Sequence, residues 1–278
     1  MNPHPSLRDR VVIVTGGGRG IGREFVLALA AAGAKIVASA RSASELAQVD
    51  AEVTAAVGPR RFVGVVAEVR DPAACEQVVA RTLDAFGALH GLVNNAGIGM
   101  RHVSEQFNVT PPRFWEARVD RWRDILETNA LGPFFMAHAA APRMVSGGFG
   151  RIVNISTSPA TMVRIGYSPY GPSKAALEAM SRIWAQDLAD TGVTVNVLLP
   201  GGATDTSFIP GSGPGRRGAD GHLLPANIMN AALLWLLSDA SSGVNGRRLV
   251  GKLWDPSLAP DEAAARAMQP HPDLPSIL

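Results

Sequence analysis

Short runs of apolar, β-branched residues alternate along the chain with longer segments whose apolar positions recur at helical spacing. We predict strands for the short runs, because nearly continuous apolar runs are typical of parallel strands covered by helices on both faces. The predicted strands are Val11–Val14, Lys35–Ser39, Phe62–Val66, Gly91–Val93, Arg151–Ile155, Thr194–Leu199 and Arg248–Val250. The predicted helices are Gly20–Ala32, Ser44–Ala56, Pro72–Phe86, Val119–Val145, Ser173–Asp190 and Pro225–Ser238.

This alternation predicts an α/β fold in one domain, residues 1–278, with a doubly wound Rossmann-type sheet of seven mainly parallel strands and helices on both faces. Three segments interrupt the pattern: residues 99–117, residues 204–225 and the tail 254–278. We predict no conformation for them. The first two follow predicted strands, so we expect them to flank a substrate at the carboxyl edge of the sheet.

The composition excludes several other classes of protein. Hydrophobic residues make up 46% and charged residues 18%, which fits a compact soluble protein that we expect to be cytoplasmic. The net charge of +2 comes from interspersed signs, so we predict no nucleic-acid partner. Gly33 and Lys35 interrupt the most hydrophobic stretch, which argues against a membrane span. Cys75 is the only cysteine and the six histidines lack metal-ligand spacing, so we predict neither a disulfide nor a metal site.

A glycine-rich turn, Thr15-Gly-Gly-Gly-Arg-Gly-Ile-Gly22, joins the first predicted strand to the first predicted helix. Gly16 can form the tight turn, and the N-terminus of the helix offers free N–H groups to a pyrophosphate. The spacing is one residue wider than the usual Gly-x-Gly-x-x-Gly form, and an ordinary strand-to-helix turn is the alternative. The residues expected to bind a dinucleotide here are Gly16, Gly18, Arg19, Gly20, Ile21 and Gly22.

The end of the second predicted strand bears on the choice of dinucleotide. An acidic residue there would bind the ribose 2′-hydroxyl of NAD, but the sequence is Ser39-Ala40-Arg41. Arg41 and Arg19 are therefore expected to bind a 2′-phosphate, which favours NADPH/NADP, with NAD as the less favoured cofactor. Two solvent-exposed arginines without this role are the alternative.

Tyr170 and Lys174 are separated by one helical turn, so their side chains share a helix face. A free phenol has a pKa of about 10, too high for efficient base catalysis at neutral pH. The ammonium group, together with an oxidised nicotinamide, favours the phenolate, so this pair is expected to exchange a proton with a substrate. Tyr167 is rejected as a rival base, because the residue four positions later is Gly171 and not a lysine.

Together these motifs resemble the short-chain dehydrogenase/reductases over residues 10–253. The resemblance implies that Tyr170 is the acid/base, that Lys174 also binds the nicotinamide ribose, and that Asn129 holds a water molecule in a proton relay. The family serine that polarises the substrate oxygen lies about thirteen residues before the tyrosine. That register falls on Thr157, with Ser158 second and Ser156 third, and ordinary strand-end hydrogen bonding is the alternative for each.

The resemblance also extends the predicted cofactor site. Glu68 and Val69 stand where the family has Asp-Val beside the adenine. The usual C-terminal Asp-Gly-Gly is absent, and Gly251-Lys-Leu-Trp254 stands nearby instead. A turn after the fourth predicted strand and a second one after the sixth are expected to line the cofactor cleft. Their residues are Asn95, Ala96 and Gly97 in the first turn, and Pro200, Gly201 and the hydroxyls of Thr204 or Thr206 in the second.

These features predict an NADPH-dependent oxidoreductase that transfers a hydride between the nicotinamide and a small-molecule carbonyl or secondary alcohol. A cofactor-retaining epimerase or dehydratase on the same site, or a non-catalytic dinucleotide-sensing protein, are the alternatives. By resemblance, helices 119–145 and 173–190 would pair between subunits, which predicts a homodimer or homotetramer. Candidates for apolar substrate walls are Phe114, Trp115, Met162, Ile165 and Phe208, and Arg216 and Arg217 are candidates for contact with an acidic group.

Overall fold

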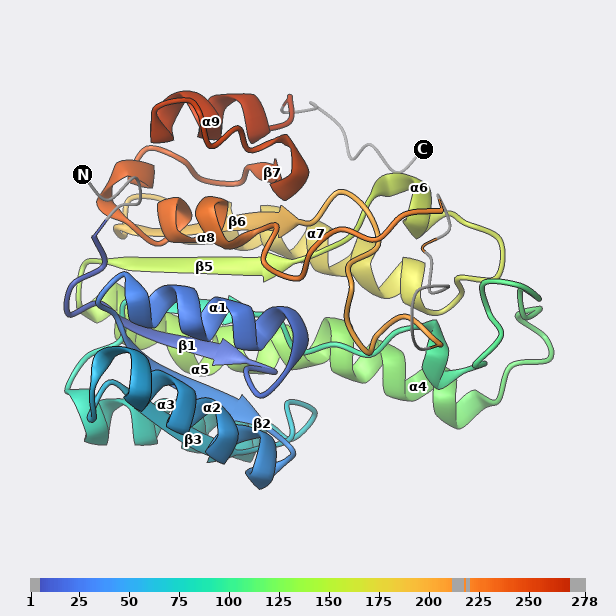
Figure 1. Ribbon diagram of the computed structural model, residues 1–278, viewed down its shortest axis with the longest axis horizontal. Helices are drawn as coiled ribbons and strands as arrows, with labels where there is room; N and C mark the ends of the chain where they lie inside the picture. Colours follow the sequence, from blue (N-terminus) through green and yellow to red (C-terminus); the bar gives the residue numbers. More distant parts are fainter. Residues whose placement is uncertain (1–5, 212–217, 219–220, 271–278) are drawn as a thin grey trace.

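The computed structural model describes residues 6–211, 218 and 221–270 (Figure 1). Its centre is a seven-stranded sheet in the order β3-β2-β1-β4-β5-β6-β7, and every neighbouring pair of strands is parallel. The predicted Rossmann-type sheet is therefore confirmed. The strands are β1 Val11–Thr15, β2 Lys35–Ala40, β3 Phe62–Val66, β4 Gly91–Asn94, β5 Gly150–Ile155, β6 Val193–Leu199 and β7 Arg248–Val250.

Helices cover both faces of the sheet because alternate side chains of the buried strands point to opposite sides. On one face, Val12 and Val14 of β1 pack with α1, α2 and α8. On the other face, Ile13 packs with α3, α5 and the end of α7. The helices are α1 Gly20–Ala31, α2 Ala43–Val57, α3 Pro72–Phe86, α4 Val119–Leu126, α5 Gly132–Ser146, α6 Pro159–Met162, α7 Tyr170–Asp187, α8 Asn230–Leu236 and α9 Pro260–Ala267.

The strand order reverses between β1 and β4, and this reversal positions the site. The chain continues from β1 to β2 and β3 on one side and from β4 to β7 on the other. The connections that leave the carboxyl ends of β1 and β4 therefore diverge, and the crevice between them is where ligands bind in open α/β sheets.

The predicted helix over residues 119–145 is wrong in one respect, because the structure divides it. A π-helical turn, Glu127–Leu131, separates α4 from α5. Pro133 has no N–H group and so cannot donate to the carbonyl of Asn129, four residues earlier, as a regular helix would require. Asn129 lies in this widened turn and is fully buried.

Two other predicted boundaries also need correction, and the tail forms a helix for which there was no prediction. The helix predicted from Ser173 begins at Tyr170, with Pro169 in the capping position. The helix predicted over residues 225–238 is α8, which is shorter because residues 226–229 form turns. The tail, for which no conformation was predicted, forms α9 and then returns to the sheet, where Met268 pairs antiparallel with Leu249.

The ends of the predicted substrate loop 204–225 are joined by backbone hydrogen bonds. Leu224 donates to the carbonyl of Ala203 at 2.7 Å, and Asp205 donates to the carbonyl of Leu224 at 2.8 Å. Arg216 and Arg217, proposed from the sequence as contacts for an acidic group, lie outside the described residues. No helix in the described part of the chain is long and apolar enough to cross a membrane.

Candidate active site

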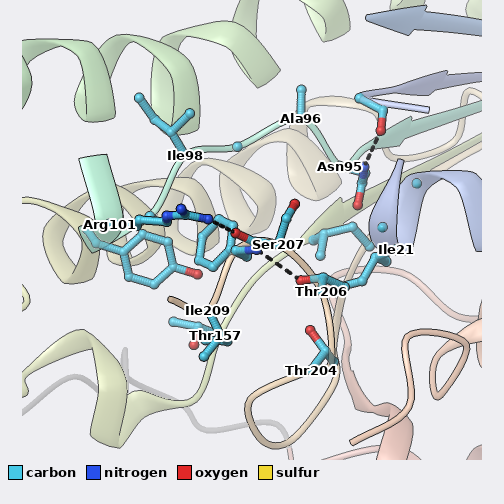
Figure 2. A pocket seen from close by; sticks show the side chains of 18 of the residues that line it. Ile21, Asn95, Ala96, Ile98, Arg101, Thr157, Thr204, Thr206, Ser207 and Ile209 are labelled. Atoms are coloured by element: carbon cyan, nitrogen blue, oxygen red, sulfur yellow. Dashed lines mark hydrogen bonds between the residues drawn. The ribbon is translucent and has the colours of Figure 1, made fainter. Parts of the chain in front are cut away.

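A cavity of about 1020 Å³ opens at the carboxyl edge of the sheet (Figure 2). All of the residues predicted to bind the cofactor line it, although they come from six separate parts of the chain, whereas Asn129 and most of the predicted substrate walls lie outside the lining. Ile21, Asn95 and Ala96 lie at one end of the view in Figure 2, and Arg101, Thr157 and Ile209 lie toward the other. The cavity is thus elongated, with the glycine turn at one end and the residues around Tyr170 at the other.

The glycine turn needs glycine both for its backbone conformation and for close packing against neighbouring backbone. Gly16 and Gly20 both have positive φ, of 66° and 53°, which glycine adopts without strain. A Cβ on Gly16 would lie 2.9 Å from the Cα of Ala96, and one on Gly22 would overlap the carbonyl oxygen of Gly16. Within the described chain, no side chain caps α1 and no acidic residue lies in its first turn. The turn therefore fits a pyrophosphate at the positive end of a helix dipole.

Asn95 and Thr15 hold the two connections of this crevice together. The Thr15 hydroxyl accepts hydrogen bonds from the backbone N–H groups of Asn95 and Ala96, each at 3.0 Å. In the other direction, the Asn95 side chain donates to the carbonyls of Thr15 at 2.9 Å and Gly16 at 3.3 Å. The Asn95–Gly97 turn thereby fixes the position of the glycine turn.

Arg19 and Arg41 both line the cavity, and both guanidinium groups are largely exposed. Each has a carboxylate neighbour. Arg19 Nη1 lies 3.3 Å from Glu45 Oε1, and Arg41 Nη1 lies 3.7 Å from Glu68 Oε2. Surface ion pairs of this kind contribute little energy, so an anionic ligand can displace them. Both arginines are therefore positioned to bind a phosphate group.

The other predicted cofactor residues also line the cavity. Glu68 is oriented by Arg70, which donates to it from the backbone at 3.3 Å and from the guanidinium at 3.1 Å. The Thr206 hydroxyl accepts from the backbone N–H of Phe208 at 3.4 Å, whereas Thr204 is buried in a bridge to Leu224. Further residues of this group in the lining are Val69, Gly97, Pro200 and Gly201.

Tyr170 and Lys174 lie in the first two turns of α7. Lys174 is buried and Tyr170 is partly buried, and the loss of solvent shifts their pKa values in opposite directions. Burial raises the pKa of Tyr170 to about 12, while a hydrogen bond with the Thr157 side chain opposes this rise. Burial lowers the pKa of Lys174 to about 8, and the negative charge of Glu178 opposes that shift. Desolvation disfavours the charged form in both cases. The phenol is thus neutral at neutral pH, and the lysine is close to its titration range.

Lys174 and Asn129 are held by backbone carbonyls from different elements. Lys174 Nζ donates to the carbonyl of Ile155, at the end of β5, at 2.8 Å. Asn129 forms two hydrogen bonds with the backbone of Ile98, each at 2.9 Å, and donates to the Ser173 hydroxyl at 3.1 Å. The amide is thereby fixed in the π-helical turn, close to Gly97 and to the base of α7.

The three candidate hydroxyls after β5 differ in their surroundings. Ser156 donates to Glu178 Oε1 at 2.6 Å and is buried. Ser158 caps α6, where its oxygen accepts from the backbone N–H of Thr161 at 3.2 Å. All three residues line the cavity, and the Thr157 side chain is the one that acts on Tyr170, whose pKa it lowers against the effect of burial. The role of Thr157 in polarising a substrate stays a prediction, and its effect on Tyr170 supports it.

At the substrate end, Phe208 lies against Tyr170, with ring centroids 5.8 Å apart and an interplanar angle of 62°. Arg101 holds the loop in this position, since its guanidinium donates to the carbonyl of Ser207 at 2.9 Å (Figure 2). A side chain on Gly99 would overlap the Phe208 ring. Phe208 is the one predicted wall residue that lines the cavity. Met162 is buried outside the lining, and Phe114, Trp115 and Ile165 are exposed outside it.

Several residues in and around the site were not identified from the sequence. Ser42 and Glu45 line the phosphate end, and the capping pattern that begins α2 directly after Arg41 is a signal that could have identified them. Arg101 and Phe107 lie in the irregular segment 99–117, where no periodic pattern indicates which side chains turn inward. The sequence could not identify the Ile155 carbonyl as the partner of Lys174, because every residue has a backbone carbonyl.

Comparisons with known proteins agree with this arrangement. A family model described as short chain dehydrogenase matches residues 10–212. The chain is 38% identical over 210 residues to a short-chain type dehydrogenase/reductase of Picea abies, with 74% of each chain covered. It is 34% identical over 222 residues to an NADPH-dependent aldehyde reductase-like protein, chloroplastic, of Arabidopsis thaliana, covering 76% of this chain and 79% of that protein. A crystal structure of a dehydrogenase/reductase from Sinorhizobium meliloti 1021 has a TM-score of 0.76 at 30% identity, covering 89% of this chain and 95% of that one.

The fold and the cavity define the class of protein as a dinucleotide-binding α/β enzyme. The chain belongs to the short-chain dehydrogenase/reductase family, and it is an NAD(P)-dependent oxidoreductase. The uncapped N-terminus of α1, beside the glycine turn in the cavity lining, fits such a cofactor.

Proposed function

We propose that this protein is an NADPH-dependent reductase of a small carbonyl compound, running in reverse as a dehydrogenase of the corresponding secondary alcohol. The observation that carries the proposal is that Tyr170, Thr157 and the buried Lys174 line the same part of the cavity, where the Thr157 side chain opposes the rise of the Tyr170 pKa on burial. A carbonyl oxygen placed there would accept from both hydroxyls.

The nicotinamide supplies the hydride when the cofactor is bound, and the residues of the chain manage the proton. Tyr170 gives its phenolic proton to the substrate oxygen, and Thr157 donates a second hydrogen bond that stabilises developing negative charge on that oxygen. Lys174, as an ammonium, favours the phenolate that remains after the proton has left. Asn129 orders the groups at the base of α7, from which a proton can return to Tyr170.

The preference for NADPH is proposed from the charges at the opposite end of the cavity. Arg19 and Arg41 line it. The two residues that follow β2 are Arg41 and Ser42, the cap of α2, so neither supplies a carboxylate there. A 2′-phosphate would replace the exposed ion pairs to Glu45 and Glu68 with charge-assisted hydrogen bonds. The Arabidopsis relative described as NADPH-dependent supports the same preference.

The residues for subunit pairing are proposed from exposed apolar side chains. Leu131, Phe134 and Ile183 are exposed, and they belong to the helix layer that contains α5 and α7. We therefore propose a homodimer or homotetramer formed through this layer.

The experiment is NADPH oxidation against a panel of aldehydes, ketones and quinones, with NADH in parallel. Turnover that is lost in Tyr170→Phe, with NADPH binding retained, is the expected result. Arg41→Ala should raise the KM for NADPH about tenfold or more and leave the KM for NADH nearly unchanged, because it removes one charge-assisted hydrogen bond. Full activity in Tyr170→Phe would overturn the proposed chemistry, and equal effects of Arg41→Ala on both cofactors would overturn the proposed preference.

A further inference from the structure

An ion-paired arginine on the edge strand β7 reaches the backbone of the residue proposed to polarise the substrate. Arg248 donates from Nη2 to the carbonyl of Thr157 at 2.7 Å. Its Nε lies 3.1 Å from both carboxylate oxygens of Glu178, on α7. Both side chains of this pair are largely buried, at 16% and 20% exposure. Hydrogen bonds of this charged kind are short and directional, so they hold a backbone segment in a defined position.

Glu178 joins this contact to the rest of the site. The same carboxylate accepts from the Ser156 hydroxyl at 2.6 Å, so Arg248 and Glu178 contact two successive residues after β5. Glu178 also lies one helical turn after Lys174, and its charge opposes the lowering of the lysine pKa by burial. The pair therefore links β7, α7 and the segment that carries Thr157.

The C-terminal segment supports the arginine from its other side. Arg248 Nη1 donates to the side-chain oxygen of Gln269, and the backbone N–H of Gln269 donates to the carbonyl of Arg248 at 2.8 Å. Met268 pairs with Leu249 in an antiparallel bridge. Residues 268 and 269, beyond α9, thus pack along β7 and hold the guanidinium in place.

We infer that Arg248 is a positioning residue for the proposed reductase reaction. Held by Glu178 and Gln269, it fixes the Thr157 backbone so that the threonine hydroxyl points at the Tyr170 phenol. The inference rests on the proposed function. The inference also gives the segment after α9 a role in the site. Through its contact with Arg248, this segment helps to position the residues at the reactive end of the cavity.

The test is a double-mutant cycle between Arg248→Lys and Thr157→Ala, measured by kcat for the carbonyl substrate. Lysine keeps the charge but cannot contact Thr157, Glu178 and Gln269 together as the planar guanidinium does. We expect kcat to fall about tenfold to a hundredfold in Arg248→Lys, because small displacements of a reacting group have effects of that size. In the Thr157→Ala background, the same change should reduce kcat by less than about twofold.

Arg247→Lys is the matched control, since Arg247 is the neighbouring arginine on the same edge of the sheet and lies outside the cavity lining. It should leave kcat unchanged. The dissociation constant for NADPH, measured by tryptophan fluorescence, should stay within about twofold of wild type in all of these variants. If Arg248→Lys fails to fold, Gln269→Ala removes one support of the arginine and should show a smaller loss of kcat that also vanishes with Thr157→Ala.

Equal losses of kcat with and without Thr157 would overturn the inference, because the arginine would then act on general stability and not through the threonine. Unchanged kcat in both Arg248→Lys and Gln269→Ala would overturn it as well. Failure of the proposed function is distinguishable: wild type would then show no turnover that depends on Tyr170, whereas failure of the inference leaves that turnover intact.

Discussion

At the residue scale, the site depends on which hydroxyl after β5 is free to meet a substrate. The spacing to Tyr170 already indicated Thr157, but Ser156 and Ser158 could not be excluded from the sequence, because all three are adjacent. The structure separates them by their partners: Ser156 contacts Glu178, Ser158 caps α6, and Thr157 contacts Tyr170. Which hydroxyl has which partner is a tertiary property, and no local pattern encodes it.

This assignment predicts that Thr157→Val lowers kcat about a hundredfold, because one donor to a developing oxyanion is typically worth that much. Thr157→Ser should retain most of the activity. Ser158→Ala is the control, and it should affect the stability of α6 more than kcat. Steady-state kinetics of the three variants provide the measurement. If Ser158→Ala showed the larger loss of kcat, the assignment to Thr157 would be wrong.

The buried lysine predicts a pH dependence with a defined sign. Burial lowers the pKa of Lys174 to about 8, so the ammonium form is present below that pH and is lost above it. The rate of reduction should therefore fall as the pH rises through about 8. Lys174→Arg keeps its charge in this range, since arginine stays protonated to a pH above about 12. Its activity should be lower throughout but flat across the same interval, and an identical alkaline decline would contradict the role given to Lys174.

At the element scale, the hydrophobic pattern located all seven strands and most helices, because buried parallel strands and amphipathic helices have distinct periods. The π-helical turn at Asn129 was missed, although Gly132-Pro133 interrupts the backbone hydrogen bonds there. Helix α9 was missed too, in spite of Pro260 at its start and two acidic residues in its first turn. Short helices of this kind are stabilised mainly by the surface on which they pack, which a local pattern does not describe.

The loop that carries Phe208 packs against Gly99 at the substrate end of the cavity, and this packing can be tested. Gly99 leaves room for the Phe208 ring, so Gly99→Ala should displace Phe208 and lower kcat/KM about tenfold, a moderate effect of misplaced groups at a reacting centre. Phe208→Ala removes the overlap. Adding it to Gly99→Ala should therefore restore part of the lost activity relative to Gly99→Ala alone. Losses that simply add in the double variant would contradict this packing relationship.

At the scale of the whole molecule, the site is assembled where the strand order reverses, with the glycine turn after β1 on one side of the reversal and the Asn95–Gly97 turn and α7 on the other. The order of motifs along the chain was enough to predict this arrangement. The return of the C-terminal segment to β7 could not be predicted in this way. It depends on the contact of Gln269 with Arg248, and no pattern in the sequence relates these two segments.

The exposed apolar residues of α5 and α7 predict how whole subunits associate. Phe134→Glu should weaken association, because the charge would be buried without a partner in the proposed interface. Val57→Glu is the control, since Val57 is also exposed but ends α2, on the opposite face of the sheet. Sedimentation velocity provides the measurement, with circular dichroism to verify the fold. A wild-type monomer, or equal effects of the two variants, would contradict this interface.

The central claim is that the cavity transfers a hydride while Tyr170 transfers the proton. The most direct measurement uses NADPH deuterated at the transferred position and a carbonyl compound that the panel identifies as a substrate. Mass spectrometry of the product should find one deuterium bonded to the new carbinol carbon in wild type and almost no product in Tyr170→Phe. Product without deuterium, or isomerised substrate with the cofactor unchanged, would contradict the reductase and point to chemistry in which the nicotinamide returns its hydride.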